Sequence, residues 1–245
     1  MKRLLEWQIA TITSIKDETS EVKTLTLALP SWTPHRPGQH YDVRLTSEDG
    51  YSAQRSYSVA SEPERTGEID LTVERIGDGE VSPYLDDTVV VGDRFEVRGP
   101  VGGYFVWDRS VGGSLLLVAG GSGVVPLMAM LRHRAAAGVK DPARLLYSAR
   151  TYDQVIYGQE LEMLARKNGF AVAYTLTRTQ PAGWKGYARR IDDAMLKEVS
   201  APLGRNALAY VCGPTALVEV AADGLERIGL SADRIRTERF GPSGP

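Results

Sequence analysis

The apolar pattern of this chain of 245 residues changes near Asp108, and that change limits the folds open to it. Before Asp108, short runs such as VKTLTLAL and EIDLTVERI alternate apolar with polar residues or are rich in branched side chains. Turn signals such as Pro37-Gly38 and Asp49-Gly50 separate these runs. Short strands at this spacing predict an antiparallel β-barrel or sandwich over residues 1–108, with one short helix at VSPYLDD.

After Asp108, apolar runs alternate with segments of helical periodicity. The strand–helix pairs are SLLLVAG with VVPLMAMLRHRAAAG, ARLLYSAR with GQELEMLARKNG, FAVAYTLTR with RRIDDAMLKEVSAP, and ALAYVCGP with TALVEVAADGLERIG; a short strand, IRTERF, follows. Alternation of this kind builds a parallel sheet with helices on both faces. The sequence therefore predicts two domains, a β-barrel over 1–108 and an α/β domain over 109–245.

Composition narrows the class of protein. The hydrophobic fraction of 42% and the charged fraction of 24% are typical of a globular chain. A formal net charge of −2 provides no overall field for holding nucleic acid. Residues 1–110 carry 12 Lys/Arg against 19 Asp/Glu, whereas residues 111–245 carry 17 against 12. The basic half suits a small anionic ligand, although chance variation in surface charge gives the same asymmetry.

Cysteine usage and hydropathy exclude several further classes. Cys212 is the only cysteine, so no disulfide forms within the chain, and a reducing, cytoplasmic location is expected. One cysteine cannot hold an iron–sulfur cluster or a cysteine-based zinc ion, and we predict no metal site. The longest apolar run, LLLVAG, is far shorter than the about 20 residues of a membrane-spanning helix, so no span is expected.

The turn AGGSGVVP at residues 119–126 joins an apolar strand to a helix. Glycines in such a turn let the backbone approach a diphosphate, and the helix N-terminus adds N–H donors. The match to the dinucleotide fingerprint is imperfect, because Pro126 stands where the third glycine is expected after Gly121 and Gly123. A hydrolase nucleophile elbow around Ser122 is disfavoured, because Val124 replaces its required downstream glycine.

A second signal, Arg55-Ser56-Tyr57-Ser58, lies in the β region. An arginine can bind a diphosphate with two parallel hydrogen bonds. Tyr57, two residues later on the same strand face, can lie flat against an aromatic ring, with the Ser58 hydroxyl at the edge of that ring. Taken alone, these four residues are equally consistent with the polar end of a strand.

Together the two signals show a resemblance to the ferredoxin–NADP reductase superfamily, and most closely to the reductase components that supply oxygenases. The resemblance covers nearly the whole chain. It rests on RSYS at 55–58, GEVSPYL at 79–85, GPVGGYF at 99–105, AGGSGVVPLMAML at 119–131, TRTQPAGWKGYARRI at 177–191, CGPTALV at 212–218 and ERF at 238–240. Seven segments in the family order make it specific.

The resemblance implies that the barrel binds FAD. Arg55 would bind the flavin diphosphate, Tyr57 would stack on the isoalloxazine, and Ser58 would hydrogen-bond near flavin N5, with Ser56 in the same motif. Glu238 and Phe240 match a glutamate and an aromatic residue that lie at the flavin in plant-type members. Two further sets would contact the cofactor: Thr72, Val73 and Glu74 beside the ribityl and adenosine part, and Gly79, Val81 and Ser82 at the phosphates. Core packing is the alternative for Val73 and Val81.

The resemblance also implies that the second domain binds NADPH, with NADH as the alternative. The residues expected at the phosphates are Gly120, Gly121, Ser122 and Gly123, and those expected beside the nicotinamide are Cys212, Gly213 and Pro214. The 2′-phosphate of NADPH would be bound by Thr177, Arg178, Lys185 and Tyr187, or by Ser148 and Arg150 after the second strand. A buried structural Cys212 and a solvated basic face are the corresponding alternatives.

The expected activity is hydride transfer from NADPH to FAD, followed by electron transfer to a separate one-electron carrier such as a ferredoxin or an oxygenase component. Ser58 and Cys212, from different domains, would lie at one reaction site together with Glu238. The alternatives are a free-flavin or quinone reductase and a flavin-binding redox subunit without turnover.

Overall fold

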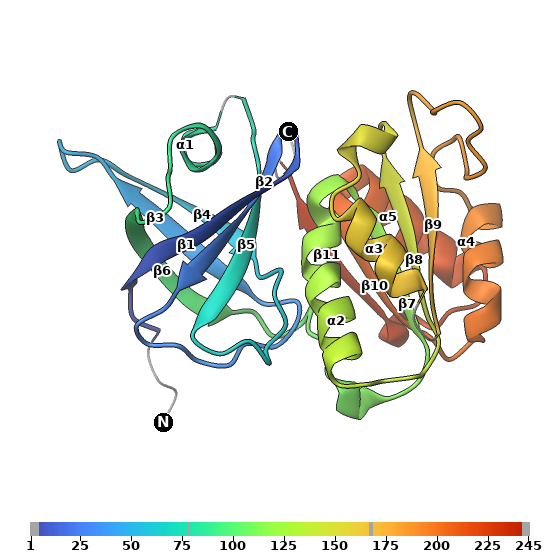
Figure 1. Ribbon diagram of the computed structural model, residues 1–245. Helices are drawn as coiled ribbons and strands as arrows, with labels where there is room; N and C mark the ends of the chain where they lie inside the picture. The colour runs from blue at the N-terminus through green and yellow to red at the C-terminus, as the bar shows by residue number, and fades with distance from the viewer. Residues whose placement is uncertain (1–4, 78, 167–168, 242–245) are drawn as a thin grey trace. The chain divides into compact units, whose positions relative to one another are not determined.

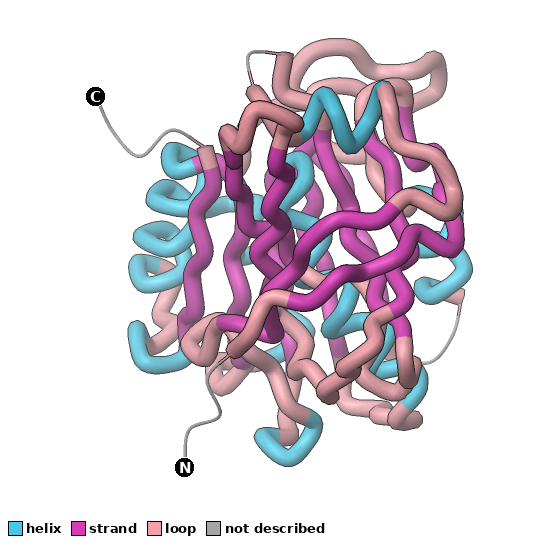
Figure 2. Tube along the Cα trace, turned by 90° about the vertical axis from the view of Figure 1, so that its left-hand side faces the viewer, coloured by secondary structure: helices cyan, strands magenta, loops and turns pink. Residues whose placement is uncertain are grey.

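The computed structural model describes residues 5–77, 79–166 and 169–241. The chain divides into two compact units, the first formed by the residues up to 108 together with 128–136, and the second by 109–127 and the residues from 137 onward. Strands dominate the first unit, whereas strands and helices alternate in the second (Figures 1 and 2). This confirms the predicted fold class, while a single domain boundary between 108 and 109 stays a prediction.

The first unit is a closed antiparallel sheet. Its elements are β1 (Gln8–Thr19), β2 (Val22–Ala28), β3 (His40–Thr46), β4 (Ser52–Ser58), β5 (Glu68–Glu74), α1 (Ser82–Asp87) and β6 (Arg94–Val101). The strand order is β4-β3-β6-β1-β2-β5, which leaves β4 and β5 at the edges. Val59, directly after β4, bridges Leu71 of β5, and the Ala60 N–H donates to the Asp70 carbonyl oxygen at 2.8 Å. This bridge closes the sheet into the predicted barrel.

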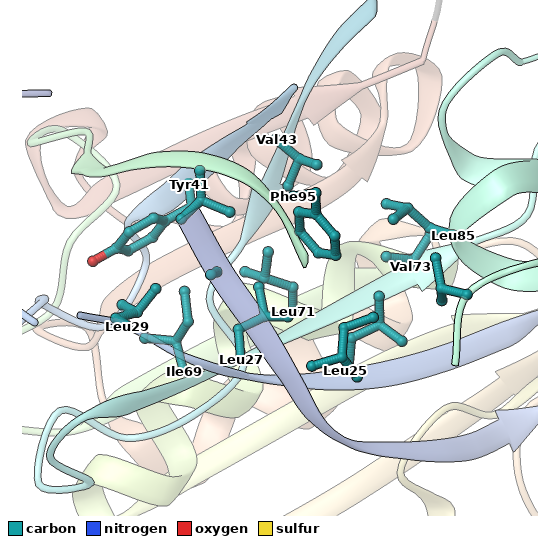
Figure 3. Close-up of a cluster of buried hydrophobic side chains, with 14 of the residues drawn as sticks. Leu25, Leu27, Leu29, Tyr41, Val43, Ile69, Leu71, Val73, Leu85 and Phe95 are labelled. Carbon is teal, nitrogen blue, oxygen red and sulfur yellow. The ribbon is translucent and has the colours of Figure 1, made fainter. Parts of the chain in front are cut away.

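Alternate residues of the strands fill the barrel. Leu25 and Leu27 of β2 and Leu71 and Val73 of β5 are buried together, because every second side chain of a strand points to the same face (Figure 3). Leu85 of the predicted short helix α1 completes this core. Burying a side chain of this kind contributes about 1.5–3 kcal/mol.

Buried Asp42 ties β3 to both of its neighbours. Its Oδ1 accepts a hydrogen bond from Ser56 Oγ of β4 at 2.7 Å, and its Oδ2 accepts one from Arg98 Nη2 of β6 at 2.8 Å. Burial opposes the charge of this carboxylate, but the bonds from Ser56 and Arg98 outweigh burial and hold the pKa of Asp42 below its ordinary value. Asp42 thereby fixes the edge strand that carries Arg55 and Tyr57.

The second unit contains a parallel sheet. Its elements are β7 (Leu115–Gly120), β8 (Ala143–Ala149), α3 (Gly158–Ala165), β9 (Phe170–Leu176), α4 (Asp193–Ser200), β10 (Leu208–Pro214), α5 (Thr215–Arg227) and β11 (Ile235–Phe240); α2 (Val124–Ala136) begins here. The strand order is β11-β10-β7-β8-β9, all parallel, as predicted. Figure 1 shows α3 on one face of this sheet and α5 on the other. None of the helices in the described residues is long and apolar enough to cross a membrane.

Helix α4 starts later than its sequence pattern predicts. The pattern indicates a helix from Arg189, but the structure begins α4 at Asp193. Asp192 occupies the N-cap, where its Oδ1 accepts a hydrogen bond from the Met195 N–H at 2.8 Å. Arg189 pairs with Asp192 at 2.6 Å and stays outside the helix. Met195 then packs into the core beneath the sheet, with Val218 of α5.

We expect Asp42→Ala to lower the free energy of unfolding by about 1.5–3 kcal/mol, because it removes a charged acceptor from two donors. Because the folded-state pKa is depressed, this contribution is complete above the unfolded pKa of about 3.9 and is lost as pH falls through the folded value. Urea denaturation at several pH values measures it. Exposed Glu21 is the control, since Glu21→Ala should change stability by less than about 0.5 kcal/mol. A difference from wild type that stays constant into acid would contradict this account.

Candidate functional site

The edge strand β4 presents Arg55 and Tyr57 on its inward face. The register pairs Arg55 with Val43 and Tyr57 with Tyr41, and both partners are fully buried. Directly opposed residues of an antiparallel pair point to the same face. Because β4 is an edge strand, Arg55 is nevertheless exposed, and its Nη1 donates to the Gln54 carbonyl oxygen at 2.7 Å. A guanidinium and an aromatic ring therefore lie two residues apart on edge strand β4.

The end of β4 offers neutral groups. Tyr57 is half-buried against the barrel core, and burial raises its pKa to about 12. Ser58 is half-buried and is the register partner of His40. Burial lowers the pKa of His40, so its imidazole is neutral at physiological pH. A ring, a hydroxyl and a neutral imidazole suit an uncharged aromatic ligand, and His40 is a residue that the sequence patterns did not assign to the site.

Ser56 lies on the other face of β4. Its hydroxyl donates to Asp42, so its side chain serves the barrel. Because successive side chains of a strand alternate, this contact lies away from the face that carries Arg55 and Tyr57. Any contact of Ser56 with a cofactor would therefore be made by its backbone.

The predicted contacts on β5, and Val81 at the start of α1, divide in the same way. The side chains of Val73 and Val81 are fully buried in the barrel core, as the core-packing alternative expected, so any cofactor contact from them is through the backbone. Thr72 lies on the outer face, where its Oγ1 is 2.8 Å from Thr24 Oγ1. Glu74 is exposed at the end of the strand.

The turn before α1 carries hydrogen-bond donors. Val81, which has no polar side chain, occupies the N-cap of α1, so no capping side chain engages the N–H groups of the first turn. Ser82 Oγ accepts a hydrogen bond from the Ile76 N–H at 3.1 Å, and its own proton remains to donate. A Cβ on Gly79 would lie 3.1 Å from Ser82 Oγ, so glycine keeps this turn tight. These donors and the Arg55 guanidinium fit a diphosphate.

In the second unit, the turn from β7 into α2 packs directly on the end of β10. A Cβ on Gly123 would lie 2.1 Å from the Cys212 carbonyl oxygen, and one on Gly120 would lie 2.6 Å from Leu217 Cδ1. Gly121 has φ +53°, and its missing Cβ has no described atom within 4 Å. Gly123 is therefore required by its contact with backbone, Gly120 lies tightly against the Leu217 side chain, and Gly121 leaves open backbone for a phosphate. This cradle fits the diphosphate of a nicotinamide dinucleotide.

The end of β10 lies beside β11. The register pairs Cys212 with Glu238 and Pro214 with Phe240, with Gly213 between them, at the carboxyl end of the sheet. Ligands bind at this end in open α/β folds. Burial, and after it the charge of Glu238, raises the pKa of Cys212, so the thiol is neutral. A neutral buried thiol suits packing against a ring and does not suit a nucleophile.

The two predicted pairs for the 2′-phosphate lie next to each other. Ser148, at the end of β8, is the register partner of Gly120 in the cradle. The Arg178 N–H donates to the Arg150 carbonyl oxygen at 2.9 Å, so the two arginines leave neighbouring strands side by side, with Thr177 between β9 and Arg178. Both arginines are exposed, and within the described part of the chain no hydrogen bond or ion pair engages either guanidinium. The two pairs, separate in sequence, form one basic corner.

Lys185 and Tyr187 lie on the loop after β9. Tyr187 forms a short parallel bridge to Thr175 of β9. Trp184 Nε1 donates a hydrogen bond to the Tyr187 carbonyl oxygen at 3.0 Å. Trp184 also packs edge-on against Tyr152, with ring centroids 5.8 Å apart. Lys185 is exposed between these anchored aromatic residues. The sequence patterns did not assign Trp184 to the site. The one feature that could have indicated it is a large aromatic residue in an otherwise polar loop.

Two family models match the two sites. Residues 9–106 match an oxidoreductase FAD-binding domain, and residues 117–223 match an oxidoreductase NAD-binding domain. The chain belongs to the ferredoxin–NADP reductase superfamily. The resemblance seen in the sequence motifs is therefore confirmed, and the cofactors of this oxidoreductase are FAD and a nicotinamide dinucleotide.

Relatives of known function are reductases. A glycine betaine monooxygenase reductase subunit from Chromohalobacter salexigens is 32% identical over 84% of this chain and 56% of its own length. The ferredoxin reductase component of a 3-ketosteroid-9-alpha-monooxygenase from Rhodococcus rhodochrous is 28% identical over 95% of this chain and 64% of its own. The chain thus spans between about half and two thirds of the length of these relatives.

Solved structures show the same fold. A cytochrome P450 reductase from Amycolatopsis superposes with a TM-score of 0.83 at 25% identity, over 98% of this chain and 71% of that one. A ferredoxin NADP+ reductase from Neisseria gonorrhoeae, solved with FAD and NADP, gives 0.82 at 21% identity, over 95% and 98%. The barrel followed by a parallel α/β sheet is therefore the fold of this family.

Substituting Gly123 should damage the nucleotide cradle. We expect Gly123→Ala to cost about 1–3 kcal/mol of stability or more, because its Cβ would meet backbone atoms that cannot give way. Affinity for NADP+ should fall with it. Thermal melting and equilibrium dialysis measure the two effects. In Gly158→Ala, the control, the new Cβ would meet only Val155 Cγ1 at 3.5 Å; equal behaviour of the two variants would show that the Cys212 contact is unimportant.

Proposed function

We propose that this protein takes hydride from NADPH onto FAD and passes the electrons one at a time to a separate carrier, a ferredoxin or an oxygenase component. The observation that carries the proposal is that one chain holds two turns with free backbone or side-chain donors, each of which fits a diphosphate. One is built from Arg55 and the turn at Ser82, and the other from the Gly120–Gly123 turn. Each lies in the stretch that matches its own dinucleotide-binding domain.

Bound FAD supplies the conversion between two-electron and one-electron transfer, since nicotinamides give hydride and iron–sulfur or haem acceptors take single electrons. The residues of the chain bind and orient. Arg55 would hold the diphosphate, the Tyr57 ring would support the isoalloxazine, and Ser58 would offer its hydroxyl as a hydrogen-bond partner to the flavin. Cys212 would contact the nicotinamide, and Glu238 is the register partner of Cys212 on the neighbouring strand. No side chain has to ionise, in agreement with the neutral Tyr57 and Cys212.

The names of the relatives support a protein acceptor, because both are reductase parts of monooxygenase systems. A free flavin or quinone as acceptor is the second candidate, and a flavin-binding subunit without turnover is the third. The intact nicotinamide cradle favours turnover. Oxidation of NADPH with a dye acceptor would exclude the flavin-binding subunit without turnover. The rates of NADPH oxidation with purified ferredoxin and with free flavin would then distinguish a protein acceptor from a small-molecule acceptor. A cytoplasmic location is proposed from the single, buried Cys212.

The purified protein should be yellow and should release FAD, not FMN, on denaturation. Arg55→Ala should lose most of its flavin, because the diphosphate would keep its charge without a partner, a cost of roughly 2–5 kcal/mol. Chromatography of the released flavin and the absorbance ratio of flavin to protein measure both effects. Lys16→Ala, at an exposed position of β1, is the control and should keep its flavin. Full flavin content in Arg55→Ala would remove Arg55 from the diphosphate site.

We infer a preference for NADPH over NADH from the corner that holds Arg150 and Arg178. Arg178→Ala should raise the KM for NADPH about tenfold and leave the KM for NADH nearly unchanged, because only NADPH carries the 2′-phosphate. Steady-state kinetics with both coenzymes measure this. Arg205→Ala, an exposed arginine elsewhere in the unit, is the control. Equal effects on both coenzymes would show that Arg178 does not bind the 2′-phosphate.

A further inference from the structure

Gln39 is a buried polar residue to which neither the sequence motifs nor the proposed hydride transfer assigns a role. It directly precedes β3, and only 9% of it is exposed. A buried amide needs hydrogen-bond partners, because an unpaired polar group away from water is costly. Both ends of the Gln39 amide have such partners, and the partners lie on different segments of the barrel unit.

The side-chain amide joins two stretches of backbone. Gln39 Oε1 accepts a hydrogen bond from the Arg36 N–H at 2.7 Å, and Gln39 Nε2 donates one to the Gly102 carbonyl oxygen at 2.7 Å. Because an N–H only donates and a carbonyl oxygen only accepts, the two partners fix which way the amide points. Gly102 directly follows the last residue of β6, and Arg36 belongs to the loop before β3. The amide therefore ties the end of β6 to that loop.

The backbone of Gln39 makes a third connection, to the end of β4. Its carbonyl oxygen accepts a hydrogen bond from the Val59 N–H at 2.9 Å, and Val59 is the residue after Ser58. The next residue of the chain, His40, is the register partner of both Ser58 of β4 and Val101 of β6. Gln39 thus lies where β3 begins and where β4 and β6 end.

The segment after β6 needs a contact of this kind to hold its position. It contains two successive glycines, Gly102 and Gly103, and glycine has the widest conformational freedom of any residue. Gly102 has φ +105°, and a Cβ added to it would lie 3.6 Å from His40 Nδ1. The segment therefore passes close to the imidazole, and the bond from Gln39 holds it there.

We propose that Gln39 is a positioning residue for flavin reduction: its amide holds the Gly102 segment against His40 and thereby fixes the imidazole and the Ser58 hydroxyl at the end of β4. The inference rests on the hydride transfer proposed above. Loss of the amide should slow reduction without releasing the flavin, because Arg55 and the turn at Ser82 stay intact. A misplacement of about 1 Å between reacting groups costs about 100-fold in rate.

The first test is Gln39→Glu, which keeps an acceptor for the Arg36 N–H but places an oxygen, in place of a donor, against the Gly102 carbonyl oxygen. With FAD bound and NADPH saturating, we expect flavin reduction per bound flavin to be about tenfold slower than in wild type. The Kd for FAD should stay within about threefold, since the diphosphate donors are separate. Anaerobic rapid mixing measures the rate, and flavin fluorescence measures the Kd. Visible circular dichroism of the oxidised protein should also change, because it reports the surroundings of the flavin.

Lowering the pH from about 8 to about 5 should reverse the defect of Gln39→Glu, because burial raises the pKa of the new carboxyl above the ordinary value of about 4.3. Of its ionisable neighbours in the chain, Arg36 is exposed to water and His40 is neutral, so burial decides that pKa. The protonated carboxyl then donates to the Gly102 oxygen as the amide does. The rate should approach that of wild type at the same pH. Gln39→Met has a similar length but no donor, and it should stay slow at every pH.

Gln8→Glu is the matched control. Gln8 makes the same pair of bonds to the backbone of Ser31, at 2.9 Å and 3.3 Å, on the surface of the same unit. It should leave the rate, the Kd and the dichroism unchanged.

A wild-type rate per bound flavin in Gln39→Met would overturn the inference, even if that variant melts at a lower temperature, because it would leave Gln39 a structural role only. A defect in Gln39→Glu that persists at the acid pH would overturn it as well, since the Gly102 bond would then not be the cause. A wild-type protein whose flavin NADPH does not reduce would refute the proposed function itself, which is a separate result.

Discussion

The nucleotide site of this protein depends on a contact of backbone with backbone. Gly123 lies against the Cys212 carbonyl oxygen at a separation that no Cβ allows. Because the two strands β7 and β10 are hydrogen-bonded neighbours, this approach draws the turn onto the carboxyl end of β10. The same approach brings Cys212 under the cradle and leaves Gly121 facing outward. The turn proposed to bind the phosphates and the strand end proposed to contact the nicotinamide are thereby brought together by one packing constraint.

The barrel has a different requirement, because β4 forms a ladder only with β3 and has to keep part of its inward face accessible to a ligand. Edge strand β4 has its inward face partly exposed, so Arg55 and Tyr57 can meet a ligand. A strand left open in this way needs support from its other face, and the Asp42 carboxylate supplies it through Ser56 and Arg98. Ser56, which lies between Arg55 and Tyr57, therefore stabilises the barrel through its hydrogen bond to Asp42. Side chains that stabilise the barrel and side chains available to a ligand therefore alternate along β4.

Much of the fold follows from local patterns. Period-two runs predicted the barrel strands, and alternating apolar runs and helical segments predicted the parallel sheet, since burial on one face or on both leaves different patterns. Deviations arise where a side chain competes with the helix pattern. Asp192 caps α4 and excludes Arg189 from it, although the apolar spacing extends further. Likewise, the sequence places Val73 and Val81 in motifs, but only the fold shows that their side chains are buried in the core.

The sequence by itself determined the two sheets, the glycine turn, the Arg55–Ser58 motif and the family, because these depend on residue type and spacing over a few positions. Only the tertiary structure decided which of those residues share a surface. It joined Arg150 to Arg178 through neighbouring strand ends, placed Ser56 on the far face of β4, and brought Gln39 to Gly102 across 63 positions of sequence. Such contacts depend on strand order and register, which are set by the packing of the whole sheet and leave no periodic trace in the chain.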